Sequence, residues 1–273
     1  MSSNDFTTLA LSAPAEGVVH VSLNRPKKLN AMNRAFWPEV TRCFKMLSAD
    51  PECRAIVLSA NGRIFTAGLD LTDMPRPKQG DDTARTAYYM HGHLLHLQES
   101  FNAIESCAKP VVACVHSACV GGGIDMIAAC DVRLCTADAW FCVKEAEIGI
   151  AADLGTLQRL PKCIGSASVV RELALTARKM LAEEALRVGL VSAVSESRDA
   201  MLRDGIAMAA RMASLSPIAV QVTKRQLNYA RDHTVQDGLD YIASWNMAML
   251  QADDVGAAAM ASMQKTKATF SKL

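Results

Sequence analysis

The sequence predicts an α/β fold with a helical carboxyl-terminal part. The apolar run 110–115 is short and bounded by turn residues, which is typical of a strand buried in a largely parallel sheet. A turn of small residues, then three glycines and an apolar segment with helical character, 124–129, follow this run. From residue 199 onward nearly all of the chain has helical spacing. A buried strand, a turn and a helix in succession, followed by helices alone, indicate this fold class.

The composition is that of a globular protein with a large core. The chain has 273 residues, 50% of which are apolar, and a formal net charge of +1. Its basic residues are scattered, so we expect no nucleic-acid partner. No apolar run approaches the roughly 18 residues that span a bilayer, so we expect no membrane segment.

The cysteines and histidines do not suggest a metal site. There are nine cysteines and no C-x-x-C pair. An odd number, with several in apolar segments, is typical of a reducing compartment and not of a disulfide framework or a zinc site. Cys119, beside the glycines, could be a reactive thiol, but packing is the favoured interpretation. His91, His93 and His96 cluster with only Glu99 near them, so we expect no metal.

The amino-terminal half alternates between strands and helices. Residues 6–24 predict two short strands that form a hairpin. Residues 34–49 predict a helix with apolar side chains on one face, and 55–59 predict a compact buried strand. A polar loop at 74–82 precedes 83–107, where the spacing predicts one long helix.

The second half is predicted to be mainly helical. Residues 156–160 have helical character, and we expect Pro161 to end that helix. Residues 190–194 predict a short strand. Further helices are predicted at 166–176, 182–188, 199–215, 217–230, 234–251 and 253–265.

Gly121, Gly122 and Gly123 stand where the buried strand meets the next helix. Glycine at such a junction lets a ligand approach the backbone closely. The N–H groups at the start of a helix also have no partner within the helix. The sequence therefore predicts a ligand site with backbone donors at this junction.

Four acidic residues follow in apolar surroundings: Asp125, Glu145, Glu147 and Asp153. Burial raises the pKa of a carboxyl group, which can then carry a proton near neutral pH. With backbone donors, such acids predict proton transfer next to a carbonyl group. Structural interpretations stay open. Asp125 could be an acid in the first turn of a helix that interacts favourably with the helix dipole, and the two glutamates could be solvated residues paired with Lys144.

Several segments together carry a family resemblance. They read VSLNRPKKLNAMN at 21–33, RIFTAGLDL at 63–71, the stretch 109–165, ALTARKMLAEEALRVGLVSAV at 174–194, and SPIAVQVTK at 216–224. In this order and spacing they resemble the enoyl-CoA hydratase/isomerase (crotonase) family. The resemblance implies a crotonase-like spiral of ββα turns followed by a helical oligomerisation region.

The same resemblance implies how the chain is organised. Residues 1–198 are expected to form the spiral core with the CoA and acyl pocket, and the helix at 83–107 is expected to line that pocket. Residues 199–273 are expected to pack against neighbouring subunits of a homo-oligomer, either a trimer or a dimer of trimers. CoA is part of the substrate, so no separate cofactor is expected.

Substrate-binding residues are also implied. Two backbone N–H groups form the oxyanion hole of the family, and they fall here on Leu69 and Gly122. Lys28 lies in a loop expected near the CoA pyrophosphate, although a solvated loop is the alternative. Further substrate contacts are expected around Leu69, from Ala67, Gly68, Asp70 and Leu71.

Within the family, VKEAEIGIAADLGTLQRLP at 143–161 is most similar to the 3,5-2,4-dienoyl-CoA isomerases, which carry an acid where Asp153 stands. This implies isomerisation of 3,5-dienoyl-CoA to 2,4-dienoyl-CoA in the beta-oxidation of unsaturated fatty acids. Glu145 is then the base at C2, and Asp153 the acid that protonates C6. Asp125 aligns with a hydratase catalytic acid that is usually Glu. Because it is one methylene shorter, we expect it either to tune the charge of Glu145 or to stay neutral.

Two other functions stay open. A 2-enoyl-CoA hydratase would use Asp125 and Glu145 to handle water, but an acid at 153 would have no task in hydration. A non-catalytic relative would bind acyl-CoA without turnover, although all the expected acids are present.

Two further features carry expectations. Ser117 and Ala118 stand where the isomerase pattern has glycines, and a serine there could crowd the turn that sets Gly122. The last residues, Ser271-Lys272-Leu273, match the carboxyl-terminal peroxisomal address. We therefore expect the protein in the peroxisome or a related microbody, with an import receptor as a partner.

Overall fold

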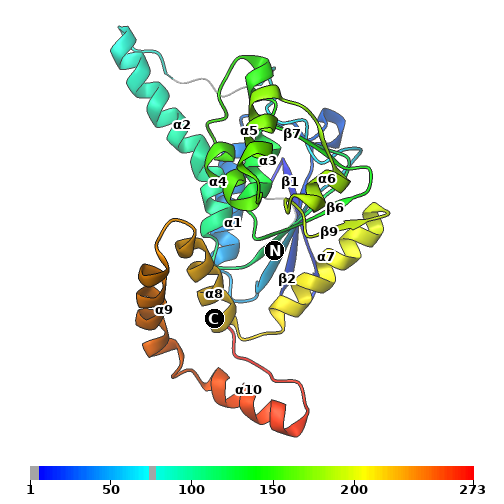
Figure 1. Cartoon of the computed structure of the whole chain (residues 1–273), viewed down its shortest axis with the longest axis vertical. Coiled ribbons are helices and arrows are strands. Elements are labelled where there is room, and N and C mark those ends of the chain that lie inside the picture. Colours follow the sequence, from blue (N-terminus) through cyan, green and yellow to red (C-terminus); the bar gives the residue numbers. More distant parts are fainter. Residues whose placement is uncertain (1–5, 74–77) are drawn as a thin grey trace.

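Two β-sheets lie at the centre of the computed structural model, which describes residues 6–73 and 78–273 (Figure 1). The larger sheet has six strands in the order β1-β2-β3-β4-β6-β9, and the smaller has three in the order β5-β7-β8. The larger sheet consists of β1 (Leu9–Ala15), β2 (Val18–Leu23), β3 (Ala55–Ala60), β4 (Val111–Val115), β6 (Val132–Thr136) and β9 (Ala193–Ser195). The smaller sheet consists of β5 (Ala118–Val120), β7 (Trp140–Cys142) and β8 (Met180–Leu181).

From β4 to β7 successive strands alternate between the two sheets, so the chain winds as a spiral. Strands β2, β3, β4, β6 and β9 pair in parallel, and β1 forms an antiparallel hairpin with β2. Strand β4 joins the larger sheet, β5 joins the smaller, and helix α3 (Gly122–Ala128) follows. Strands β6 and β7 repeat this order before the 3-10 turn η2 (Glu145–Ile148). The chain therefore forms the expected ββα turns.

Every residue of β3 and β4 is buried. Strands with near-continuous apolar sequence are buried on both faces, so helices must cover both sides of the sheet. These helices and those beyond the sheet are η1 (Pro26–Lys28), α1 (Phe36–Ala49), α2 (Thr83–Ser106), α4 (Thr156–Cys163), α5 (Ala167–Thr176), α6 (Ala182–Arg187), α7 (Arg198–Ala213), α8 (Pro217–Ala230), α9 (Val235–Met249) and α10 (Asp253–Gln264).

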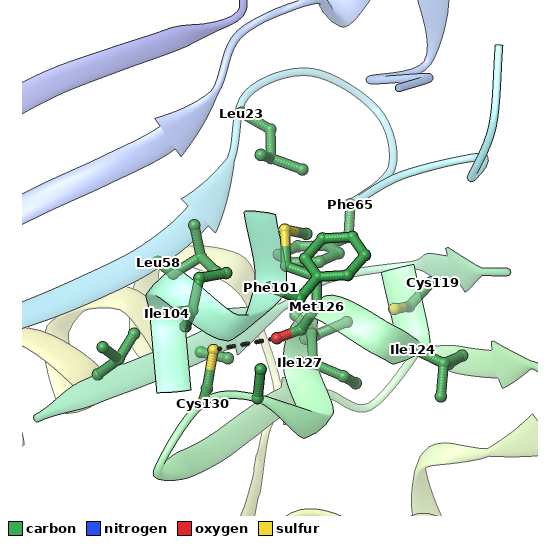
Figure 2. Close-up of a cluster of buried hydrophobic side chains, with 14 of the residues drawn as sticks. Leu23, Leu58, Phe65, Phe101, Ile104, Cys119, Ile124, Met126, Ile127 and Cys130 are labelled. Atoms are coloured by element: carbon green, nitrogen blue, oxygen red, sulfur yellow. Dashed lines mark hydrogen bonds between the residues drawn. The ribbon is translucent and has the colours of Figure 1, made fainter. Parts of the chain in front are cut away.

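The main core lies on the side of the sheet that faces α1, α2 and α3. All residues of α3 are buried. Figure 2 shows Ile124, Met126 and Ile127 of α3 in one cluster with Phe65 and with Phe101 of α2. Burying each such large side chain stabilises the fold by roughly 1.5–3 kcal/mol. This packing fixes α3, and with it the glycines that begin the helix.

Helix α7 covers the opposite face of the larger sheet. Val57, Cys114 and Leu134 from three strands form a second buried cluster with Met201 and Ala209 of α7. The expected division at 198/199 therefore falls after the first residue of α7, a helix that packs on the sheet. Helices α8, α9 and α10 lie together at one end of the molecule (Figure 1). The division into two parts stays a prediction.

The structure corrects the expected effect of Pro161. Helix α4 does not end there but continues to Cys163, with the Ile164 N–H bonded to the Leu160 carbonyl at 3.0 Å. A proline removes one helical N–H, whose acceptor here would be the carbonyl of Leu157. Leu157 is exposed, so water can satisfy that carbonyl, while buried Leu160 keeps the helix against the core.

Other elements differ in smaller ways. Strands β6 and β7 were not predicted, because Arg133 interrupts the apolar pattern of the first and the second has only three residues. The strand predicted at 190–194 is β9, which begins at Ala193, because the Leu190 N–H bonds the Ala185 carbonyl at the end of α6. Residues 74–77 of the loop predicted at 74–82 lie outside the described residues.

Within the described part of the chain, no single helix has the length and apolar character to cross a bilayer. Helices α7 and α8 pass that test only as a pair, and they are bent by 110° where they meet.

Candidate active site

Strands β5 and β7 of the smaller sheet run parallel to each other and to the segment at Thr66, and all three end at one edge. Thr66 pairs with Cys119, and Val120 pairs with Cys142. Three residues beyond the first pairing the segments reach Leu69 and Gly122, and three residues beyond the second they reach Gly123 and Glu145. In α/β structures ligands bind at the carboxyl ends of parallel strands. The register therefore places two backbone donors and one carboxyl group at the same edge.

The N–H groups of Leu69 and Gly122 are available to a ligand. The Gly68 carbonyl accepts from the Met32 N–H at 2.8 Å and the Asp70 N–H donates to the Met32 carbonyl at 3.1 Å, so Leu69 turns its N–H the other way. Gly122 is the first residue of α3, where an N–H has no intrahelical acceptor. Neither N–H has a hydrogen-bond partner among the described residues.

Steric requirements explain the glycines at this edge. Gly68 has a φ of 85°, and a Cβ on it would lie 2.8 Å from the Val120 carbonyl oxygen. Gly121 has a φ of 55° and a ψ of −123°, which side chains rarely adopt. A Cβ on Gly123 would lie 2.5 Å from Cγ2 of Thr66. The two donor segments can approach each other this closely because these residues are glycines.

A cavity of about 570 Å³ opens at this edge. It is mostly apolar, with Met90, His93, Leu94 and Leu97 of α2 along one side. These four residues are spaced so that they lie on one face of the helix. The other lining residues are Met32, Trp37, Ala67, Gly68, Leu69, Leu71, Val120, Gly121, Gly122, Asp125, Lys144, Glu145, Ile148, Ile150, Asp153 and Leu154.

Asp125 lies on α3 at the inner end of the site and is 1% exposed. Its Oδ1 accepts a hydrogen bond of 2.6 Å from the N–H of Thr156, the first residue of α4. Burial raises the pKa of Asp125 to about 6, although this hydrogen bond opposes the shift. The negative charge of Asp153 raises the same pKa further.

Glu145 begins η2 and is 8% exposed. Its Oε2 is buried and has no hydrogen-bond partner in the described part of the chain. Burial, and then the charges of Asp125 and Asp153, raise the pKa of Glu145 to about 7. A carboxyl group with an unsatisfied buried oxygen and a pKa near neutrality can exchange a proton with a ligand in the cavity.

Asp153 also lines the cavity, and part of its side chain is exposed to solvent. Partial burial raises the pKa of its carboxyl group. Glu147, by contrast, is exposed and forms an ion pair of 2.5 Å with Lys144. Because the segment is a 3-10 turn and not extended, Glu147 does not share the side of Glu145. The structure thus brings Asp125, Glu145 and Asp153 to one cavity and leaves Glu147 outside it.

The remaining predicted substrate residues divide into two groups. Ala67, Gly68 and Leu71 line the cavity. Asp70 does not; it is buried, forms an ion pair of 3.0 Å with Arg25 and accepts from the hydroxyl of Thr72 at 2.7 Å. The structure therefore gives Asp70 a part in holding its own loop.

Lys28 is exposed at the end of η1 and does not line the cavity. Its turn nevertheless abuts the cavity wall, because the Leu29 carbonyl accepts from the Ala67 N–H at 3.0 Å.

Ser117 adopts the backbone conformation that a glycine would favour. Its φ is 52°, in the left-handed region, and its carbonyl accepts from the Trp140 N–H at 3.0 Å. Ala118 is buried in β5. The turn before the donor glycines thus forms with serine in place, and Gly122 still begins α3 with its N–H free.

Sequence reasoning did not single out the residues of α2 that line the cavity. Their spacing is the signal that could have identified them, since an apolar face on a long helix must lie against an apolar core or an apolar ligand pocket. The same spacing is equally typical of ordinary core packing, which is why the pattern alone did not decide.

Comparison with known proteins shows the family of this chain. A family described as "Enoyl-CoA hydratase/isomerase" matches residues 14–272. The chain is 50% identical over 279 residues to a mouse protein named "Delta(3,5)-Delta(2,4)-dienoyl-CoA isomerase, mitochondrial", covering 100% of this chain and 85% of that one. It is 42% identical to an Arabidopsis thaliana protein named "Delta(3,5)-Delta(2,4)-dienoyl-CoA isomerase, peroxisomal", covering 94% of this chain and 93% of that one.

Solved structures confirm the fold. An enoyl-CoA hydratase from Bacillus anthracis superimposes with a TM-score of 0.87 at 24% identity, covering 97% of this chain and 99% of that one. A "putative Enoyl-CoA hydratase/isomerase" from Mycobacterium abscessus superimposes with a TM-score of 0.83 at 28% identity, covering 97% of this chain and 100% of that one. The expected spiral with its helical carboxyl-terminal part is therefore correct.

Proposed function

This chain belongs to the enoyl-CoA hydratase/isomerase family, and we propose that it is an isomerase that converts 3,5-dienoyl-CoA to 2,4-dienoyl-CoA. The observation that carries the proposal is the set of three carboxyl groups on one apolar cavity, with two free N–H groups beside them. Hydration would use two of these carboxyl groups, Asp125 and Glu145. A proton shift along an acyl chain also requires the third, Asp153.

The reaction begins at C2, beside the thioester. Glu145 removes a proton from C2, and the electrons delocalise over the thioester oxygen and the diene. The N–H groups of Leu69 and Gly122 hold the negative charge on that oxygen, which stabilises the dienolate. Because these donors are fixed by the sheet and by α3, they need no rearrangement as the charge develops.

Asp153 completes the reaction at C6. The dienolate carries negative charge at C6, and the proton of Asp153 forms the new C–H bond there. The double bonds then lie at C2 and C4, the proton taken from C2 resides on Glu145, and Asp153 is an anion. No proton or electron is gained or lost overall, so the reaction requires no cofactor beyond the CoA of the substrate.

Asp125 acts on the charge of Glu145. It is almost fully buried and its negative charge raises the pKa of Glu145. Its hydrogen bond to the Thr156 N–H holds its carboxyl group at the start of α4, directly after the loop that carries Asp153. The CoA moiety is proposed to lie over Ala67, Gly68 and Leu71, with Lys28 on the neighbouring turn near its phosphates.

A direct assay tests the proposed function. Purified protein is added to a 3,5-dienoyl-CoA, and ultraviolet absorbance follows the 2,4-dienoyl thioester, whose diene is conjugated with the carbonyl. We expect a rapid rise. No rise together with fast hydration of a 2-enoyl-CoA would make the protein a hydratase. Binding of both thioesters without turnover of either would make it a non-catalytic acyl-CoA-binding protein.

The compartment is a separate proposal, since similar proteins are named mitochondrial in mouse and peroxisomal in Arabidopsis thaliana. We propose the peroxisome, because Ser271, Lys272 and Leu273 match an address read by an import receptor. A fluorescent protein fused to the amino end is expected to coincide with a peroxisomal marker and to become diffuse when these three residues are removed. Retention in mitochondria would contradict the proposal.

We also propose that the protein is a homo-oligomer, either a trimer or a dimer of trimers. Exposed large apolar side chains on and near α9 and α10 support it, because such residues gather at protein interfaces. They are Val235, Leu239, Met247, Leu250, Met260 and Met263. Light scattering is expected to give three or six times the chain mass of 29.4 kDa; the mass of a single chain would contradict it.

A further inference from the structure

The loop that carries Asp153 separates two cavities. Leu154 lines the acyl cavity on one side and a second cavity of about 560 Å³ on the other. A segment with space on both sides is not held in place by packing alone. The position of the Asp153 carboxyl group therefore depends on the particular bonds that hold residues 153–155.

Arg159 of α4 supplies the central bonds. Its Nη1 donates to the Leu154 carbonyl at 3.4 Å, and a Cβ on Gly155 would lie 2.0 Å from the same nitrogen. The guanidinium group thus lies directly against the loop. Gly155 has a φ of 129°, a conformation that only glycine adopts readily, so the loop both turns sharply and leaves room for Arg159.

One face of α2 anchors Arg159 and the loop. Gln98, Asn102 and Glu105 are spaced four and three residues apart, so they lie on the same side of the helix. Gln98 Nε2 donates to the Asp153 carbonyl at 2.7 Å. Asn102 Oδ1 and Glu105 Oε2 accept from Arg159 Nη2 at 2.6 and 2.9 Å.

The anchor is charged and largely shielded from water. The Arg159 and Glu105 side chains are 11% and 22% exposed, and Glu105 also pairs with Arg231. Burial pushes the pKa of Glu105 upward, but the hydrogen bonds and charges of the two arginines outweigh it and hold the pKa below its ordinary value. Glu105 therefore stays ionised at neutral pH, and the planar guanidinium keeps a fixed orientation.

We propose that Arg159, anchored by Glu105 and Asn102, is a positioning residue that sets the place of Asp153 for proton delivery at C6. This inference rests on the proposed isomerase function. It separates the two halves of the reaction. Glu145 and the oxyanion donors belong to other segments and Arg159 acts on Glu145 only through the charges of Asp125 and Asp153, so proton removal at C2 depends on Arg159 far less than proton delivery at C6 does.

Arg159→Met tests the proposal. In D₂O, exchange of the C2 protons of a 3,5-dienoyl-CoA is followed by NMR, and formation of the 2,4-dienoyl product by absorbance. We expect kcat for isomerisation to fall about 100-fold while C2 exchange and KM stay within about threefold of wild type, because misplacing a reacting group by about 1 Å costs this much.

Matched variants separate positioning from charge and from general damage. Arg231→Met removes the other partner of Glu105 but touches no residue of the loop, and it should leave isomerisation within about threefold. Arg159→Lys keeps the charge without the planar fork, and we expect it to lose at least about tenfold in kcat. If Arg159→Met does not fold, Asn102→Leu is used instead, because it removes only one of the two anchors of Arg159. It should lower the rate of isomerisation and leave the rate of C2 proton exchange unchanged.

Three results would overturn the inference. Wild-type isomerisation in Arg159→Met would show that the loop needs no anchor, and wild-type isomerisation in Arg159→Lys would show that charge is sufficient. An equal fall of exchange and isomerisation in all folded variants would show a general structural effect. A wild-type enzyme that isomerises no 3,5-dienoyl-CoA would overturn the proposed function itself, and this inference with it.

Discussion

Glu145→Gln is expected to lower the rate of isomerisation by about 10³–10⁴-fold, the upper part of the range for loss of a general base. The amide keeps the shape of the side chain but cannot accept a proton from C2. Because the reaction starts with that step, neither product formation nor exchange of the C2 protons should persist. Absorbance of the 2,4-dienoyl thioester measures product formation, and NMR of the substrate in D₂O measures exchange of the C2 protons.

Glu147→Gln is the matched control for this change. It removes a carboxyl group two residues away that is exposed and paired with Lys144. We expect it to retain activity within about twofold, as is usual for exposed surface changes. Substrate binding should survive in both variants, because the apolar cavity and the backbone donors are unchanged. Activity within tenfold of wild type in Glu145→Gln, or equal losses in the two variants, would remove Glu145 from the role of base.

Much of the scaffold around this base could be predicted from local sequence. Five consecutive apolar residues at 111–115 can hardly be placed except in a buried parallel strand, and the glycines after them mark the start of a helix. The free N–H groups follow from that junction, since the first donors of any helix lack partners. The acids stood out because they interrupt an apolar stretch.

Features that depend on tertiary contacts could not be predicted in this way. Glu105 and Arg159 meet across 54 residues of chain, and only the packing of α2 against the acid loop makes them neighbours. The 3-10 turn at Glu145 directs Glu147 away from the cavity. In an extended segment the side chains of Glu145 and Glu147 would have pointed to the same side. Asp70 looked like a substrate contact, yet Arg25, 45 residues earlier, holds it in the loop.

The protonation states of the pair Glu145 and Asp153 shape the dependence on pH. The reaction needs one proton on the pair, located on Asp153. Burial and the neighbouring charges raise the pKa of Glu145 to about 7, and partial burial raises the pKa of Asp153 as well. A bound acyl chain covers Asp153, removes water from it and so raises its pKa, which favours the reactive arrangement.

The sign of the pH effect follows from the number of protons on this pair. As pH rises through about 7 the last proton leaves the pair, the C6 donor is lost, and kcat/KM should fall. As pH falls, a second proton neutralises the base, and kcat/KM should fall again. The profile is therefore bell-shaped, and its two apparent pKa values belong to the pair and not to either residue.

Asp153→Asn is expected to separate the two half-reactions. The amide cannot deliver a proton to C6, so isomerisation should fall by about 10²–10³-fold. Exchange of the C2 protons should continue, because Glu145, Leu69 and Gly122 still form the dienolate and return a proton to C2. The variant should also lose the fall of activity above about pH 7, since only Glu145 then titrates and it is active when deprotonated. Loss of exchange along with isomerisation would mean that Asp153 supports the base at C2; an unchanged rate would mean that water or another group protonates C6, and that the third carboxyl group of the cavity serves the structure and not the chemistry.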